Sequence, residues 1–77
     1  METFQINVVI DEMPQEYEVR SIGNDIANKR YELFRTGTRQ AEVWLEATDE
    51  GPNWHTEDVM DEATLKKIGK AIERHEL

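Results

Sequence analysis

The stretch KRYELFRTGTRQAEVWLEA, residues 29–47, decides the fold of this chain of 77 residues. Apolar and polar side chains alternate on both sides of Gly37, and a period of two is typical of half-buried β-strands. The inward positions are Tyr31 and Leu33 before the glycine and Ala41, Val43, Leu45 and Ala47 after it. The stretch therefore predicts a β-hairpin that turns near Gly37.

The length of the connecting loop determines which residues of this hairpin face each other. A three-residue loop, residues 37–39, pairs Leu33 with Val43, so both apolar rows lie on the same side. A two-residue loop would pair Leu33 with Glu42 and turn the apolar side of one strand outward. The pattern therefore predicts the three-residue loop. The further pairs of that register are Tyr31 with Leu45 and Arg30 with Glu46, with Phe34 diagonal to Trp44.

Two more strands are predicted upstream of this hairpin. Residues 4–10 alternate with a single exception, and Pro14, which lacks an amide donor, predicts that residues 11–15 form a turn. A second strand follows, with Tyr17 and Val19 on its apolar side. Ile22 falls on the polar side, which suggests a change of register near Ser21. Residues 23–25 predict another turn, and residues 26–28 carry no clear signal.

The C-terminal segment carries the signals of an amphipathic helix. Asp61 is a good N-cap, and Met60 is placed to pack on Leu65 one turn into the helix. Leu65, Ile68, Gly69 and Ile72 recur at helical spacing. Glycine costs about 1 kcal/mol in a helix relative to alanine, so Gly69 on the buried face predicts a close approach of another part of the chain. Between the hairpin and the helix, residues 51–53 predict a turn and Trp54 is expected to fold back against the sheet.

These elements predict one α+β domain over residues 1–77. Its fold is a four-stranded antiparallel β-meander followed by one C-terminal helix that packs on one face of the sheet, in the order ββββα. The covered face is expected to carry Phe4, Ile6, Val8, Ile10, Tyr17, Val19, Tyr31, Leu33, Val43 and Leu45. The open face is expected to carry Val9, Ile22, Phe34 and Trp44 among Glu18, Arg20, Arg30, Glu32, Glu42 and Glu46.

Composition excludes several classes of function. The net charge is −8, and residues 49–62 hold six acidic side chains and no basic one. Such a balance opposes general binding to phosphate backbones. The chain has no cysteine, no signal-peptide pattern and no apolar run near the roughly 20 residues of a membrane span. We therefore expect a soluble, cytoplasmic protein without a membrane partner.

The sequence offers no template for catalysis or for a metal site. It contains no nucleophile elbow and no glycine-rich phosphate loop. His55 has no second histidine at metal-ligand spacing, and Glu57 and Asp58 fit no calcium-loop pattern. We therefore predict no catalytic residue, no metal and no cofactor, and we expect the protein not to be an enzyme.

Large aromatic side chains on an open, polar face are the feature that most suggests binding. The candidate interaction face consists of Val9, Arg20, Arg30, Phe34, Trp44 and Trp54. Three interpretations are open for this face. In the first, the Trp54 loop or the segment around Ile26 covers Phe34 and Trp44 and forms a second small core. In the second, a protein binds there, most simply a second copy in a homodimer. In the third, single-stranded nucleic acid binds, with bases on Phe34 and Trp44 and phosphates on Arg20, Arg30, Arg35 and Arg39.

The ββββα order resembles that of PUR-repeat and Whirly-type nucleic-acid-binding platforms, which pair into dimers. The resemblance implies a sheet face used for binding, and no functional residue is transferred from it. Arginine and glutamate alternate on the predicted face, whereas those platforms present basic grooves. The sequence therefore predicts a small acidic, non-enzymatic protein-interaction module that uses its sheet face for a homodimer or a partner, with single-stranded nucleic acid as the alternative.

Overall fold

A computed structural model describes residues 2–22 and 29–76. Its elements are β1 (Thr3–Ile10), β2 (Met13–Ile22), β3 (Arg30–Arg35), β4 (Thr38–Thr48), β5 (Gly51–Thr56) and α1 (Glu62–Glu76). Each strand pairs antiparallel with its neighbour in sequence, so the sheet order is β1-β2-β3-β4-β5. The α+β class, the meander and the C-terminal helix are confirmed. The prediction of four strands is wrong by one.

The fifth strand replaces the turn and loop expected after residue 50. β5 pairs with the outer half of β4, from Thr48 opposite Gly51 to Val43 opposite Thr56. Proline is tolerated in an edge strand when its nitrogen faces away from the neighbouring strand. Pro52 therefore fits within β5, although the same residue suggests a turn in the sequence.

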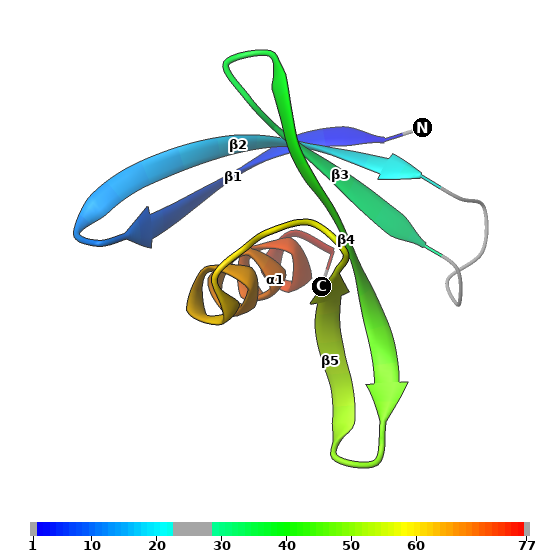
Figure 1. Ribbon diagram of the computed structural model, residues 1–77. Coiled ribbons are helices and arrows are strands. Elements are labelled where there is room, and N and C mark those ends of the chain that lie inside the picture. Colours follow the sequence, from blue (N-terminus) through cyan, green and yellow to red (C-terminus); the bar gives the residue numbers. More distant parts are fainter. Residues whose placement is uncertain (1, 23–28, 77) are drawn as a thin grey trace.

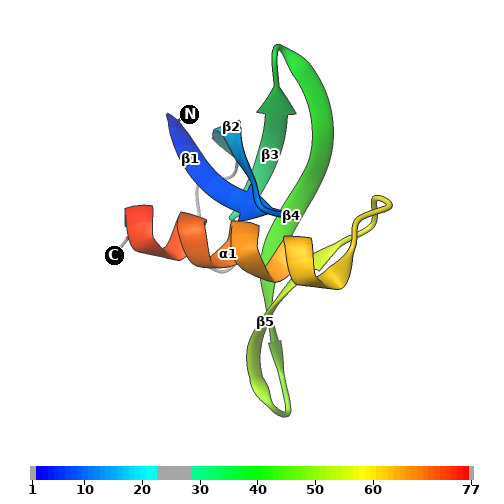
Figure 2. The ribbon, with the colours of Figure 1, turned by 90° about the vertical axis from the view of Figure 1, so that its left-hand side faces the viewer.

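The sheet is strongly curled, and α1 lies in its hollow (Figures 1 and 2). The helix contacts the two edge strands, β1 and β5. The core between sheet and helix is centred on the largest fully buried side chains, which are Val19, Leu33, Val43, Ile68 and Ile72. No helix among the described residues is long and apolar enough to cross a membrane.

The β3–β4 hairpin differs from the predicted register by two residues. Thr36 and Gly37 have φ of 48° and 81° and form a two-residue turn. Leu33 faces Ala41 and not Val43, and Arg30 faces Trp44 and not Glu46. A β-bulge is the physical reason. The register shifts between Leu33 and Phe34, which leaves one extra residue in β4 and returns both apolar rows to the same side.

This register changes the environment of Leu45, which was expected in the core. Leu45 pairs with Trp54 of β5, beyond the end of β3, and its side chain is 42% exposed. Tyr31, expected opposite Leu45, faces Val43. The prediction that Leu45 is a core residue is therefore wrong.

The β1–β2 connection is shorter than predicted. Asp11 and Glu12, with φ of 51° and 67°, form the whole turn, and Pro14 already lies in β2 opposite Val9. The register does not change at Ser21, because its amide donates to the Glu2 carbonyl at 2.8 Å in line with the β1–β2 ladder. The turn and the unassigned segment expected at residues 23–28 lie outside the described residues.

The helix follows its prediction closely. Asp61 caps its first turn through one carboxylate oxygen, which accepts from the amides of Ala63 at 3.1 Å and Thr64 at 3.3 Å. Met60 is partly buried against the core. The buried face consists of Leu65, Ile68, Gly69 and Ile72.

Candidate interaction face

The outer, convex side of the curled sheet carries most of the predicted interaction face. The pairing places these side chains in rows that cross the strands. One row runs Ile22, Arg30, Trp44 and His55, and it is called the Trp44 row below. A second row runs Gln5, Glu18, Phe34 and Arg39.

Two arginines lie over the two aromatic rings of this face. The guanidinium carbon of Arg20 is 4.0 Å from the centre of the Phe34 ring, and that of Arg30 is 4.2 Å from the centre of the Trp44 ring. Such cation–π contacts contribute about 0.5–1 kcal/mol each at exposed sites. Phe34 and Trp44 are half-buried because arginines of their own chain cover part of them.

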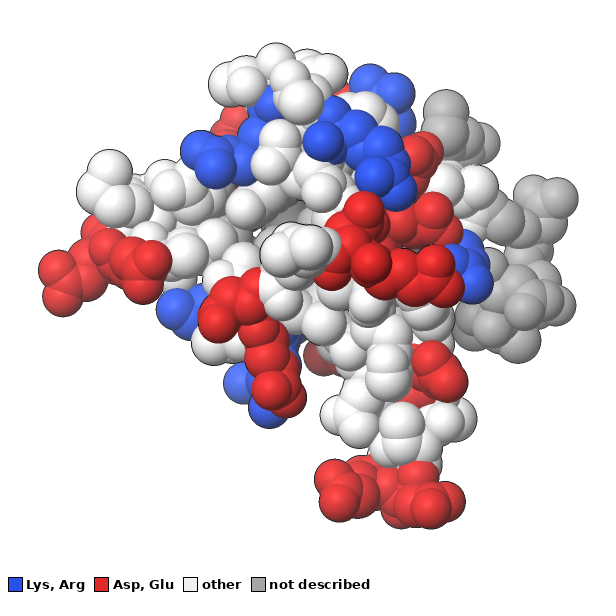
Figure 3. All heavy atoms as spheres, viewed as in Figure 1, with Lys and Arg blue, Asp and Glu red and all other residues white. Residues whose placement is uncertain are grey.

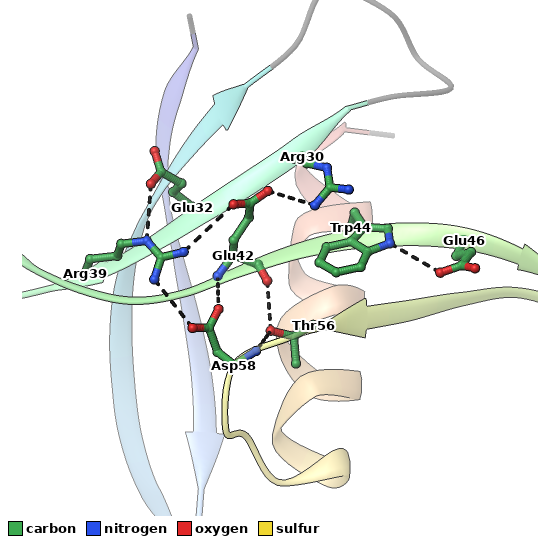
Figure 4. Close-up of polar contacts among 8 residues, drawn as sticks. All are labelled: Arg30, Glu32, Arg39, Glu42, Trp44, Glu46, Thr56 and Asp58. Carbon is green, nitrogen blue, oxygen red and sulfur yellow. Dashed lines mark hydrogen bonds and ion pairs between the residues drawn. The ribbon is translucent and has the colours of Figure 1, made fainter.

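Carboxylates hold these arginines in place. Glu18 binds Arg20 at 2.7 Å, and Glu42 binds Arg30 at 3.0 Å. Arg39 lies close to three carboxylates, at 3.3 Å from Glu32, 3.9 Å from Glu42 and 3.6 Å from Asp58 (Figure 4). Exposed ion pairs each contribute at most about 1 kcal/mol. Their main effect here is to fix the orientation of the guanidinium planes.

Asp58 joins the connection after β5 to the β4 backbone. Its Oδ2 accepts from the Glu42 amide at 3.0 Å, and the Thr56 hydroxyl donates to the Glu42 carbonyl at 2.8 Å (Figure 4). The hydrogen bond from the Glu42 amide lowers the pKa of Asp58, and the nearby Arg39 lowers it further. Asp58 thus takes the place of a β5 residue at the point where that strand leaves the ladder.

Trp54 lies on the other face of the sheet. Its ring packs over Gly69, where an added Cβ would collide with the indole, and its Nε1 donates to Glu73 at 3.0 Å. The close approach predicted at Gly69 is therefore confirmed. The interpretation in which Trp54 covers Phe34 and Trp44 is wrong, because Trp54 faces the helix. Its alternative form, with the segment around Ile26 as the cover, lies outside the described residues.

Val9 is on the convex side but away from the Trp44 row. It lies at the end of β1 opposite Pro14 and is 56% exposed. Arg20, Arg30, Phe34 and Trp44 are thus the predicted site residues that the fold brings together. Val9 and Trp54 belong to separate surfaces.

His55 is the member of this face that the sequence reasoning did not place. It faces Trp44 across β4 and β5, with ring centres 6.5 Å apart. Its Nε2 is buried, has no hydrogen-bond partner among the described residues and lies 3.7 Å from Glu46. The alternation of Trp54 and Thr56 with His55 is the signal that could have revealed β5. Within residues 2–22 and 29–76, no three metal-ligating side chains gather.

A shallow depression of about 250 Å³ lies beside Trp44. Its walls are Arg30, Arg39, Glu42, Trp44, Glu57 and Asp58. The depression is lined mainly by charged side chains and is open to solvent along one side of the indole. It offers an apolar ring next to donors and acceptors that are already oriented.

A groove of about 480 Å³ lies on the helix side of the sheet. Tyr31, Leu45, Trp54 and Ile72 form its apolar part, and Glu76 lies at its rim, 3.5 Å from the Tyr31 hydroxyl. Burial raises the pKa of Tyr31, and the Glu76 carboxylate raises it further.

Comparison with known proteins finds no family model that matches the chain, no similar curated protein and no similar solved structure.

Proposed function

We propose that this chain is a small acidic, non-enzymatic module that binds a partner protein through the Trp44 row. The observation that carries the proposal is the Trp44 indole, half-exposed, stacked with Arg30 and flanked by a depression. Tryptophan and arginine are the residue types most often found at the centre of protein interfaces. Ile22, 37% exposed, extends the apolar part of the row.

The curvature of the sheet favours a partner with a concave surface over a second copy packed face to face. Two convex surfaces touch over a small area, whereas a stable interface buries about 800 Å² on each partner. The oriented Arg30, Arg39 and Glu42 would surround the indole with polar contacts, as the rim of an interface does. The partner is therefore expected to present an apolar pocket lined by donors and acceptors.

Single-stranded nucleic acid is the alternative, and we rank it second. Base stacking needs free ring faces, whereas Arg20 and Arg30 occupy one face of Phe34 and of Trp44. Phosphate binding needs free cations, whereas Arg20, Arg30 and Arg39 each lie next to carboxylates. Salt-sensitive binding of an oligonucleotide that Trp44→Ala weakens would reverse this ranking.

A crosslinking experiment tests the proposal. In one variant a photoreactive residue replaces Trp44. In a control variant it replaces Gln5, which is exposed on the same convex face. We expect a specific protein of the source cell to be crosslinked from position 44 and not from position 5. The purified partner should bind the Trp44→Ala variant at least about 30-fold more weakly than wild type, as expected for a hot-spot residue. Equal crosslinking from both positions, or equal affinity for both proteins, would disprove the proposal.

A further inference from the structure

The outer half of the β4–β5 hairpin, residues 45–54 and called the arm below, extends beyond the helix (Figures 1 and 2). Residues 45–50 are all exposed. On the side that faces α1, the cross-strand pairs are apolar, with Leu45 opposite Trp54 and Ala47 opposite Pro52. Two-stranded ribbons are at best marginally stable alone in water, so an arm with an apolar side calls for a further contact.

The outer edge of β5 has main-chain groups for which residues 2–22 and 29–76 provide no hydrogen-bond partner. The Glu42 amide and carbonyl point toward β5, since Asp58 and Thr56 bind them. Main-chain groups alternate in direction along a strand, so the residues of β5 that bond to β4 are Asn53 and His55. The amide and carbonyl of Trp54 therefore point away from the sheet, and Pro52 offers a carbonyl in the same direction.

A groove of about 670 Å³ runs along this edge. Five consecutive residues of β5, numbers 52–56, line one wall. Because successive side chains of a strand point to opposite faces, a wall of consecutive residues marks the strand edge. The opposite wall is a single stripe of α1 that includes Leu65, Lys66, Lys70 and Glu73.

Charges of opposite sign lie at the two ends of this arrangement. Asp49 and Glu50 form the tip of the arm, and both are exposed. Figure 3 shows acidic side chains at the tip of the arm and a recess between the arm and the charged side chains beneath α1. Lys66 and Lys70 line the helix side of the groove together with Glu62 and Glu73, and within the part of the chain that the structure describes the ion-pair contact of Lys66 is with the exposed Glu62 at 3.6 Å.

We propose that the groove along β5 takes the arm of a second copy of this chain. The two arms lie antiparallel about a two-fold axis near Pro52, with their free β5 edges side by side. The tip of each arm, Asp49 and Glu50, then lies against Lys66 and Lys70 of the other copy. The two arms thereby pair along their open edges, the apolar side of each arm faces the α1 stripe of the other copy, and the two-fold closes the assembly as a dimer.

Charge reversal on each side of the proposed contact tests this arrangement. One variant carries Asp49→Lys and Glu50→Lys, and the other carries Lys66→Glu and Lys70→Glu; all four positions are exposed. As the wild-type concentration is raised to about 1 mM, light scattering should show the mass rise to twice the monomer mass of 9.0 kDa. Each variant should keep the monomer mass over the same range. An equimolar mixture of the two variants should dimerise again, because each arm then meets a helix of opposite charge.

A second measurement does not depend on these variants. In the wild type, hydrogen exchange of the Trp54 main-chain amide should slow as protein concentration rises, because this amide lies at the β5 edge. A monomeric wild type at about 1 mM, variants that stay dimeric, or a mixture that stays monomeric would each overturn the proposal. Concentration-independent exchange at Trp54 would do the same.

The Trp44→Glu variant separates this inference from the proposed function. Trp44 lies on the convex side, away from the groove, so this variant should lose the partner and keep the dimer. The arm variant with Asp49→Lys and Glu50→Lys should lose the dimer and keep the partner. Failure of one proposal therefore leaves the other standing.

Discussion

At the scale of single residues, the closest packing between sheet and helix described above is that of Trp54 on Gly69. The indole occupies the volume that a side chain at position 69 would need, and its nitrogen is held by Glu73. The sequence predicts a close approach at Gly69 because glycine is costly inside a helix. It does not predict which side chain approaches, since Trp54 meets the helix only through the fold of β5.

A substitution at Gly69 tests this contact. Gly69→Ala should lower the free energy of unfolding by about 1–3 kcal/mol, because the new methyl group meets the indole. In a Trp54→Ala background the same substitution should raise stability by up to about 1 kcal/mol, since alanine is then the better helix former. Urea unfolding of the four proteins measures both effects. The same sign in both backgrounds would contradict the proposed clash.

Asp58 makes the stability of the fold depend on pH in the acidic range. Its folded-state pKa lies below the ordinary value of 3.8 because the Glu42 amide and Arg39 favour the carboxylate. A lowered pKa stabilises the fold above the unfolded value, and this contribution is lost as the pH falls through the folded value.

The Asp58→Asn variant isolates that contribution. Its side-chain oxygen still accepts from the Glu42 amide, but it carries no charge for Arg39. The stability difference between wild type and variant should be constant above about pH 5 and should shrink as the pH falls below the ordinary value of 3.8. Chemical unfolding at a series of pH values measures the difference. Glu57→Gln, at an exposed neighbouring position, is the control, and a pH-independent difference for Asp58→Asn would refute this account.

At the scale of elements, those with a strong local pattern are predictable from the sequence. The helix from residue 62, its cap at Asp61 and the alternation in β1 and β2 follow from periodicity and capping alone. The bulge in β4 could not be predicted, because the alternation on each side of Gly37 is the same for a three-residue loop and for a two-residue loop with a bulge. β5 was missed because Gly51 and Pro52 are turn formers.

The same limit applies to the candidate site. The pattern predicted that Arg30, Phe34 and Trp44 share a face, because their positions have the same parity as the outward residues. It did not predict that Arg30 covers Trp44, since that contact requires the bulged register. Surfaces formed by β5, including the position of His55, could not be derived without that strand.

The helix cap is testable at this scale. Asp61→Ala removes the oxygen that accepts from two amides of the first turn, so stability should fall by about 1 kcal/mol. Glu62→Ala removes a neighbouring charge without removing the cap and should cost less. Thermal and urea unfolding compare the two variants. An equal loss for both would show that charge near the helix end, and not capping, provides the stabilisation.

At the scale of the whole molecule, one helix contacts both edge strands of a curled sheet and lies against β1 in particular. β1 is an edge strand of eight residues without a charge, a proline or a glycine, a composition that pairs readily with other chains. α1 contacts β1 and β5, and Lys67 donates to the Val9 carbonyl at 3.0 Å. The helix therefore shields the sheet as well as completing the core.

Removal of the helix should convert the protein into an aggregating one. A chain that ends at Met60 lacks Leu65, Ile68 and Ile72, so the apolar face of the sheet and the β1 edge lose their cover. We expect it to form β-rich aggregates that scatter light, whereas the full chain stays clear at the same concentration. A truncated chain with two further substitutions, Gln5→Lys and Asn7→Lys on β1, should aggregate more slowly, and a truncated chain that remains clear would contradict the shielding role.

The position of α1 in the chain also affects the protein while it is being made. All five strands leave the ribosome before the helix does, so the growing chain has a sheet with both edges open. At about 5–20 residues per second, synthesis of the fifteen residues of α1 takes about 1–3 s. During that interval, chains that are being made on the same messenger RNA lie close together and can pair through these open strand edges. Translation speed over the last codons of this region should therefore influence how much protein reaches the native state.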